Sequence, residues 1–387
     1  MNNIPKKVVI VGPAFPFRGG LAAYNERLAK AFIEAGYSVH ILTFTLQYPN
    51  ILFPGKTQYA TWDAPTDLHI TQSLSSINPF SWRSTAKKIQ KLSADLVVFK
   101  FWLPFMGPAF GSVAKLTKKY LPNTPIVCIL DNVIPHEKRI GDTILTRYFI
   151  KHVDAFIGMS RSVLNDLALF NKNKARRFSP HPIFDNFGKK KTKEDACQQL
   201  GLDPKLNYLL FFGIIRDYKG LDWLIEAYKA SSVDKKNIKL LVAGEFYTDA
   251  KPYKELIKKH GLTDSIILHE KFIPDEEVAN YFCAADMIVQ PYKHATQSGV
   301  TQIGYHFEKP MLVTNVGGLG EIIPDKVGGY VVEPNIEAIS QALGDFYEND
   351  RLCGYTEGII EAKQRFTWDK MIGQIELLLK DLKDETN

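Results

Sequence analysis

The length of 387 residues is more than one hydrophobic core usually serves, so we expect two domains of ordinary size. Hydrophobic residues make up 45% of the chain and charged residues 23%, the balance of a soluble globular protein, and no stretch approaches the roughly 18–20 consecutive apolar residues of a membrane span. The four cysteines lie far apart without a CxxC pair, which argues against a disulfide framework or a structural zinc site and favours a reducing compartment.

The net charge of +6 is divided unevenly along the chain. Residues 1–190 contain 25 Lys and Arg against 11 Asp and Glu, whereas the remainder contains 23 against 31. Such asymmetry indicates a partner for the basic half, and an anionic membrane surface or a plain solvated surface are the two explanations left open. No nucleic-acid motif appears, so we expect no nucleic-acid partner.

The first half alternates short apolar runs with amphipathic stretches. The opening MNNIPKKVVIVG has too short an apolar run for a signal peptide and predicts a first strand. A helix is predicted over residues 21–35, because apolar residues recur there at helical spacing until Gly36. The expected strands of this half are residues 6–12, 37–44, 94–101, 124–130 and 154–160.

The charged run GKKKTKED interrupts this pattern near residue 188 and predicts a linker over residues 188–201, after which the cycle restarts. The expected strands of the second half are residues 207–213, 238–244, 265–270, 286–291, 310–315 and 329–333. Strands alternating with helices predict parallel sheets, hence two Rossmann-like α/β domains over residues 1–187 and 202–365. Ligands of such sheets bind at the carboxyl ends of the strands, so we expect the site in a cleft that the two domains share.

Glycine-rich loops follow several predicted strands, where backbone amides can approach an anion. Each loop alone is equally typical of a tight turn, and loop cations are usually just solvated. Arg216 and Lys219 follow the strand that ends at Gly213, a position suited to a diphosphate whose charge grows as a sugar departs. The other candidate positions in these loops are Gly19, Gly20, Ser298, Gly299, Gly317, Gly318 and Glu321.

Several segments together resemble the retaining glycosyltransferases called group 1, which have the two-Rossmann GT-B fold. They are RGGLAAYNERLAKAF, VDAFIGMSRSVLNDL, FFGIIRDYKGLDWLIEAY, LLVAGEF, FIPDEEVANYFCAADMIVQPY and EKPMLVTNVGGLGEII. The resemblance implies a nucleotide-sugar donor bound chiefly by the second domain, an acceptor bound by the first, and neither a cofactor nor an obligatory metal. It also implies that a last helix, within residues 366–387, packs back onto the first domain.

The chain departs from the family pattern at three positions. The resemblance implies two glutamates eight positions apart before the KP of EKP, and Ala295 and Ile303 stand there. Gln297 and Gln302 are the nearest polar substitutes for binding donor hydroxyls. The family's arginine after the strand glycine falls on Ile214, and Arg216 is expected to reach the same phosphate.

In the first domain, CILDNVIPHEKR resembles the family segment in which a histidine or aspartate faces the sugar. Asp131 and His136 are candidate catalytic residues with Arg216 and Lys219, and Glu137 is a candidate on the acceptor side. A surface histidine is the simpler alternative at His136. The aromatic segment FKFWLPFMGPAF, which contains Trp102, is interpreted either as core packing or as an apolar acceptor pocket or membrane-facing lip. Two lysine clusters flank it in sequence, namely Lys87, Lys88 and Lys91, and Lys115, Lys118 and Lys119.

We therefore expect a metal-independent retaining hexosyltransferase that acts on a glycan or lipid-linked acceptor. We expect it in the cytoplasm, and the basic first half extends this expectation to peripheral association with the inner face of the membrane. Two alternatives remain: a nucleotide-sugar epimerase or hydrolase of the same fold, and a glycosyltransferase-like binding protein that has lost catalysis.

Overall fold

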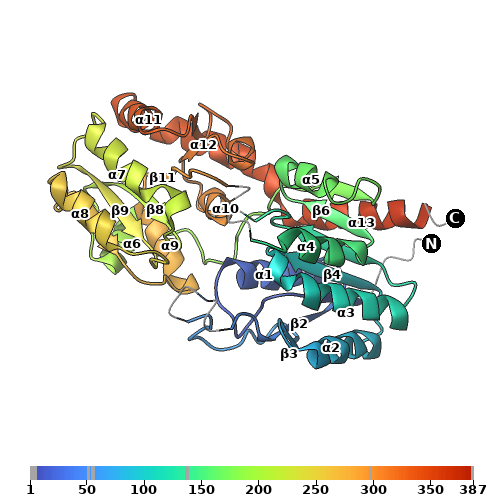
Figure 1. The fold of residues 1–387 in the computed structure, drawn as a ribbon. Helices are drawn as coiled ribbons and strands as arrows, with labels where there is room; N and C mark the ends of the chain where they lie inside the picture. Colours follow the sequence, from blue (N-terminus) through green and yellow to red (C-terminus); the bar gives the residue numbers. More distant parts are fainter. Residues whose placement is uncertain (1–6, 50–52, 54–56, 136–138, 296–297, 385–387) are drawn as a thin grey trace. The chain divides into compact units, whose positions relative to one another are not determined.

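The computed structural model describes residues 7–49, 53, 57–135, 139–295 and 298–384. The chain divides into two compact units, one formed by Met1–His181 with Thr367–Asn387 and the other by Pro182–Phe366 (Figure 1). Each unit is an α/β layer structure around its own parallel sheet.

The sheet of the first unit has seven parallel strands in the order β3-β2-β1-β4-β5-β6-β7. Its central strands are continuous apolar runs because helices cover both faces, as in β4, whose six residues are all buried. The order reverses direction between β1 and β4, which creates a switch point at the carboxyl edge. The strands are β1 (Lys7–Val11), β2 (Ser38–Leu46), β3 (Ile70–Ser75), β4 (Leu96–Phe101), β5 (Ile126–Leu130), β6 (Ala155–Gly158) and β7 (Arg176–Phe178).

The helices of the first unit connect its parallel strands and cover the faces of this sheet. The helices α2 (Pro79–Lys91), α3 (Gly107–Tyr120) and α4 (Asp142–Lys151) pack side by side in that order (Figure 1). The short η2 (Pro104–Met106) precedes α3, and α5 (Arg161–Ala168) follows β6.

The last helix, α13 (Trp368–Asp384), packs on α1 (Gly20–Glu34), β6 and β7 of the first unit, as the resemblance implies. The rings of Tyr24 and Trp368 lie 5.2 Å apart, and Arg177 Nε donates to Asp381 Oδ2 at 2.9 Å. The chain's end therefore belongs to the first unit although the second unit precedes it in sequence.

The second unit has six parallel strands in the order β10-β9-β8-β11-β12-β13, with the switch point between β8 and β11. The strands are β8 (Asn207–Phe212), β9 (Ile238–Ala243), β10 (Ile266–His269), β11 (Met287–Gln290), β12 (Met311–Thr314) and β13 (Gly329–Val332). The helices are α6 (Lys193–Leu200), α7 (Leu221–Ala230), α8 (Lys251–Lys259), α9 (Asp275–Ala284), α10 (Gly299–His306), α11 (Ile336–Glu348) and α12 (Leu352–Ala362). Short 3₁₀ turns are η3 (Asp217–Lys219), η4 (Leu319–Glu321) and η5 (Lys363–Phe366).

The boundary between the units lies at residues 181/182 rather than at the predicted linker over residues 188–201. That stretch contains α6, which packs against α9 within the second unit. Its charged residues have local roles: Lys193 forms an ion pair of 2.8 Å with the buried Asp286, so the charge run covers the unit instead of connecting two units.

Candidate functional site

The loops that contain most of the candidate residues meet at one edge of the second unit's sheet. All six strands are parallel, so β8, β9, β11 and β12 end at this edge, and their exits are Gly213, Gly244, Pro291 and Asn315. The edge next to the β8/β11 switch point is where an open α/β sheet binds its ligands.

Two glycines allow the loops at this edge to pack backbone against backbone. A side chain on Gly244 would collide with the carbonyl oxygen of Gly213, and one on Gly220 would collide with that of Pro291. Both Gly213 (φ 103°) and Gly220 (φ 70°) also have left-handed backbone conformations that favour glycine. The loop over residues 213–220 is therefore tightly fixed between its neighbours.

Lys219 lies inside this loop cluster. Its side chain is buried, and its Nζ is 3.3 Å from the point where a Cβ on Gly213 would lie and 5.4 Å from the centre of the Tyr292 ring. Burial, and to a lesser extent the charge of Arg216, lowers the pKa of Lys219 to about 7. No carboxylate of the described residues pairs with Lys219, so its charged form has no counter-ion among them.

Arg216 lies at the end of β8 beside the exit of β9. Its guanidinium lies 5.4 Å from the centre of the Tyr247 ring. The two exits are joined by backbone hydrogen bonds, because the Ile215 amide donates to Glu245 and the Tyr247 amide donates to Ile215. The half-buried Arg216 and buried Lys219 thus bring two cations to the β8 exit, as predicted.

Ser298 begins α10 next to this cluster. Its Oγ accepts from the Val300 amide at 3.2 Å and donates to Gln290 Oε1 at 2.6 Å. A side chain on Gly299 would press against the Phe184 ring at 2.9 Å, so this glycine is required for packing. Gln297 lies outside the described residues.

Gln302 is completely buried in α10. Neither its amide oxygen nor its amide nitrogen has a hydrogen-bond partner in the part of the chain that the structure describes. Gln302 therefore has unused hydrogen-bonding capacity, but it is not on the accessible surface of this conformation. Ala295 and Ile303, at the positions of the two family glutamates, are buried apolar residues.

The loop after β12 supplies the remaining candidates. Gly317 has φ 52°, Gly318 is buried, and the Glu321 side chain is exposed while its carbonyl oxygen accepts from Arg365 at 3.4 Å. Thr314, the last residue of β12, donates from its Oγ1 to the Tyr292 carbonyl oxygen at 2.5 Å and so joins the exits of β11 and β12.

Comparison with known proteins agrees with this architecture. Residues 192–366 match the family model described as "Glycosyl transferases group 1". An uncharacterized glycosyltransferase of Methanocaldococcus jannaschii is 25% identical to the chain over 98% of its length and 99% of the relative.

Over residues 192–366 the chain is therefore similar to the group 1 glycosyltransferases, and over nearly its whole length it is similar to a glycosyltransferase.

Solved structures show the same fold as this chain. A sucrose-phosphate synthase from Thermosynechococcus elongatus superposes with a TM-score of 0.77 at 16% identity, covering 98% of this chain and 100% of that one. The Anabaena protein HepE in complex with UDP superposes with a TM-score of 0.72 at 14% identity, covering 97% and 100%. HepE has also been solved in complex with UDP-glucose, with a TM-score of 0.71 at 13% identity, covering 97% and 99%. At these identities the likeness establishes the GT-B fold.

In the first unit, Asp131 follows β5 and forms an ion pair of 2.7 Å with Lys100 of β4. Lys100 is 1% exposed, and its Nζ lies 3.4 Å from the centre of the Tyr24 ring. Burial lowers the pKa of Lys100, while Asp131 opposes this shift. The pairing gives Asp131 a structural partner that the sequence pattern did not indicate, because Lys100 lies within the apolar run LVVFKF.

Of the other candidates in the first unit, two glycines have open space beside them and one tryptophan packs against the core. Gly19 (φ 98°) and Gly20 begin α1, and a side chain on either would meet open space. Trp102 is half-buried against the core, and its Nε1 donates to Tyr48 Oη at 2.6 Å, which favours the core-packing explanation of the aromatic segment. His136 and Glu137 lie outside the described residues.

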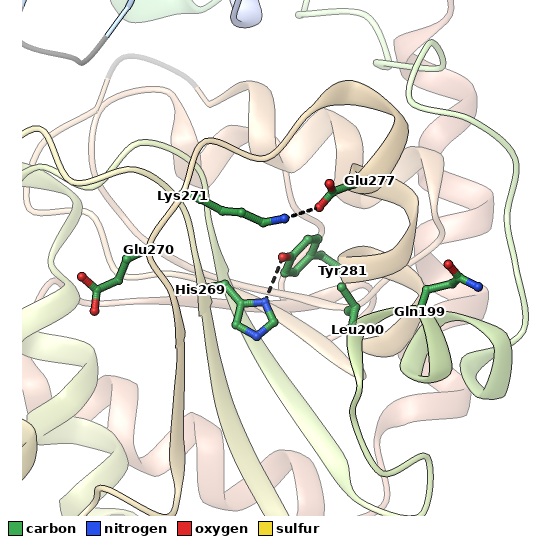
Figure 2. Close-up of a pocket in the computed structure, with 7 residues that line it drawn as sticks. All are labelled: Gln199, Leu200, His269, Glu270, Lys271, Glu277 and Tyr281. Atoms are coloured by element: carbon green, nitrogen blue, oxygen red, sulfur yellow. Dashed lines mark hydrogen bonds and ion pairs between the residues drawn. The ribbon is translucent and has the colours of Figure 1, made fainter. Parts of the chain in front are cut away.

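A pocket of about 360 Å³ lies at the end of β10, lined by none of the predicted residues. His269 Nδ1 and Tyr281 Oη face each other at 2.8 Å, and Lys271 pairs with Glu277 at 2.7 Å (Figure 2). Burial, assisted by Lys271, lowers the pKa of His269, which favours the neutral imidazole. Its residues come from separated segments without a motif, and sequence patterns provide no signal for such a pocket. Its remaining lining residues are Gln199, Leu200 and Glu270.

Proposed function

We propose that this protein is a glycosyltransferase that moves a hexosyl group from a nucleoside diphosphate sugar, a UDP-sugar in the first instance, to a hydroxyl of a glycan or lipid-linked acceptor with retention of configuration. The observation that carries the proposal is Lys219, a buried ammonium without a protein counter-ion among the described residues, at the switch-point edge of the sheet. A buried cation of this kind is stabilised by a bound anion, and a diphosphate provides one.

The arrangement suits a reaction in which negative charge develops on a diphosphate. When the bond between the sugar C1 and the phosphate oxygen breaks, the electron pair stays on the diphosphate, near Arg216 and Lys219. The amides at the start of α10 and around Gly318 add partial positive charge. The acceptor oxygen bonds to C1 from the same face, and its proton passes to the leaving phosphate oxygen.

The choice of UDP-sugars rests on structural neighbours. HepE was solved with UDP and with UDP-glucose, and it shares the fold of this chain over nearly its whole length. The proposed charge stabilisation uses protein cations, so turnover is expected to continue in the presence of EDTA. Loss of turnover in EDTA that Mg²⁺ restores would contradict the metal-independent scheme.

A binding protein without catalysis is the second candidate. Ala295 and Ile303 favour it, because buried apolar residues at the places of the family glutamates cannot bind donor hydroxyls through their side chains. The two functions differ in turnover: both predict donor binding, and only the transferase releases nucleoside diphosphate when a suitable acceptor is present.

The test begins with a thermal-shift screen of nucleoside diphosphate sugars. A ligand at about 100 times its dissociation constant stabilises the folded protein by about 2.7 kcal/mol, which is enough to rank donors. The best donor is then incubated with acceptor pools, and the anomeric configuration of the product is determined by NMR. Release of UDP with an α-linked product from an α-linked donor supports the proposal, whereas an inverted product contradicts it. Binding without turnover in any pool favours the binding protein.

A further inference from the structure

The helices α2, α3 and α4 begin at the same edge of the first unit. Each follows a parallel strand and runs antiparallel to it, so all three N-terminal ends lie at the carboxyl edge of the sheet. Contacts between α2 and α3 and between α3 and α4 place the ends in a row (Figure 1). With packed helices 8–10 Å apart, the row is roughly 20 Å long.

The outer two ends of this row expose large apolar side chains. Ile77 and Phe80 lie at the start of α2, and Phe80 is 87% exposed. Ile140 and Ile144 lie at the start of α4 and are 108% and 72% exposed. We call these four residues the apolar rim. Single exposed apolar side chains are common, but two such pairs at the two outer ends of one row of helix ends can contact the same extended apolar partner.

Basic side chains accompany the apolar rim. Arg83 lies near the start of α2, while Arg139 and Arg147 lie on either side of Ile144, and all three are exposed. Among the described residues in the first turns of these three helices, Asp142 alone is acidic. Over residues 77–151 the sequence has 12 Lys and Arg against 4 Asp and Glu. The edge therefore combines apolar tips with positive charge.

The lysine clusters expected beside the aromatic segment lie elsewhere. Lys88 and Lys91 are in the last turn of α2, and Lys118 and Lys119 are in the last turn of α3. They are therefore at the opposite ends of these helices from Trp102, roughly 18 Å away for a 13-residue helix. Their position suits the negative ends of the helix dipoles, and Lys118 also pairs with Asp154 at 2.6 Å.

We propose that the apolar rim docks on an anionic lipid bilayer, with its apolar side chains among the upper acyl chains and its arginines at the lipid phosphates. Guanidinium groups interspersed with exposed apolar tips fit the interfacial layer of a membrane, where both kinds of group are accommodated at different depths. The core of a protein interface, in contrast, is depleted of charge. Within the described residues no helix is long and apolar enough to cross a membrane, so this docking is peripheral.

Bilayer docking goes beyond the proposed transfer reaction, and it would place the unit expected to bind the acceptor next to lipid-linked molecules. The surface contains none of the residues proposed to bind the diphosphate. UDP binding can therefore be measured independently in every variant, and it tests the proposed function alone.

The experiment measures co-sedimentation of the whole chain with two kinds of vesicle. One kind is pure phosphatidylcholine, and in the other about one lipid in three is phosphatidylglycerol. The rim variant is Phe80→Ser/Ile144→Ser, and its matched control is Ile33→Ser/Leu169→Ser, which also removes two exposed apolar side chains of the first unit. A charge variant, Arg83→Gln/Arg147→Gln, is compared with Lys87→Gln/Lys119→Gln.

We expect the unaltered protein and both controls to bind anionic vesicles, and the rim and charge variants to bind at least fivefold less, with unchanged melting temperatures. Equal binding by the rim variant and its control would overturn the proposal, as would binding to neither kind of vesicle. A concentration-dependent dimer that the rim substitutions abolish would show that a second copy covers this surface instead. A lower melting temperature of the rim variant alone would show that these side chains pack within the protein, which also overturns it.

Discussion

Lys219 provides a pH-dependent test of the proposed diphosphate site. Burial brings its pKa to about 7, and a bound diphosphate is expected to raise that pKa again by pairing with the ammonium group. If UDP binds only when Lys219 is charged, the apparent dissociation constant of UDP equals the intrinsic constant divided by the charged fraction of Lys219. That fraction is most of the population at pH 6.5 and roughly one thirtieth at pH 8.5, so UDP should bind about 20–30-fold more weakly at pH 8.5.

The assay is isothermal titration of UDP between pH 6.5 and 8.5, a range chosen to stay above the second ionisation of a phosphate near pH 6. Lys219→Met should bind UDP weakly and without this slope. Lys293→Met is the matched control, because Lys293 belongs to the same loop cluster but is already paired with Asp222 at 2.6 Å. A slope that persists in Lys219→Met, or a flat profile in the unaltered protein, would refute the assignment.

The same pKa has a consequence for stability, with the sign set by proton linkage. In the unfolded chain Lys219 has its ordinary pKa of 10.5, so between pH 7 and 10.5 the unfolded state binds a proton that the folded state has lost. Folding stability therefore rises with pH over this window, and the cost of the buried charge is fully present below pH 7. Lys219→Met should accordingly raise the melting temperature at pH 6 while it weakens UDP binding, a combination that unfolding of the variant cannot produce.

Three further substitutions test the same unit. Arg216→Ala should weaken UDP binding tenfold or more, since a charge-assisted hydrogen bond contributes about 1.5–3 kcal/mol, and unchanged affinity in titration would remove Arg216 from the site. Gly220→Ala should cost at least about 2 kcal/mol in denaturant unfolding, because of its φ of 70° and the Pro291 carbonyl; Gly261→Ala, at φ 65° in open space, should cost less. Gln302→Leu should raise the free energy of unfolding by about 1–3 kcal/mol, since it removes two unpartnered buried atoms, and should leave UDP binding unchanged because the side chain is enclosed; weaker binding would show that Gln302 contacts the donor.

The strands of the second unit were predictable because each is an apolar run between turn residues, and all six form as expected. Two strands of the first unit were not. β3 includes Gln72, Ser73 and Ser75, so its apolar signal is weak, and β7 has three residues at the edge of the sheet. Edge strands bury less surface, and their sequences carry correspondingly less apolar pattern.

The sequence predicted which loops contain the candidate residues, but it did not predict which of their side chains are buried. Position in the topology brought Arg216 and Lys219 to one strand exit, as expected. That Lys219 would be buried depends on the tight packing around Gly213 and Gly220, which joins segments distant in sequence. Gln302 shows the reverse: a polar residue expected at the ligand is enclosed, because α10 is buried along residues 300–305.

The ion pair between Lys100 and Asp131 allows the proposed catalytic role of Asp131 to be separated from a structural one. Asp131 is 8% exposed and Lys100 1%, so removing either partner takes a close, oppositely charged group away from a buried charge. Lys100→Met and Asp131→Asn should therefore each lower the free energy of unfolding by about 3–5 kcal/mol, measured by urea denaturation.

The double variant Lys100→Met/Asp131→Asn decides between the two roles. It buries no unpaired charge, so its stability should recover to within about 1–2 kcal/mol of the unaltered protein, giving a large coupling energy in the double-mutant cycle. A structural role predicts that transferase activity recovers together with stability, because the fold around β4 and β5 is restored. A catalytic role predicts that activity remains lost in a double variant that is well folded, since the carboxylate itself is absent. The geometry favours the structural outcome: a carboxylate held 2.7 Å from a buried ammonium has one strong partner already, and a stable but inactive double variant would show that this partner orients it for the sugar instead.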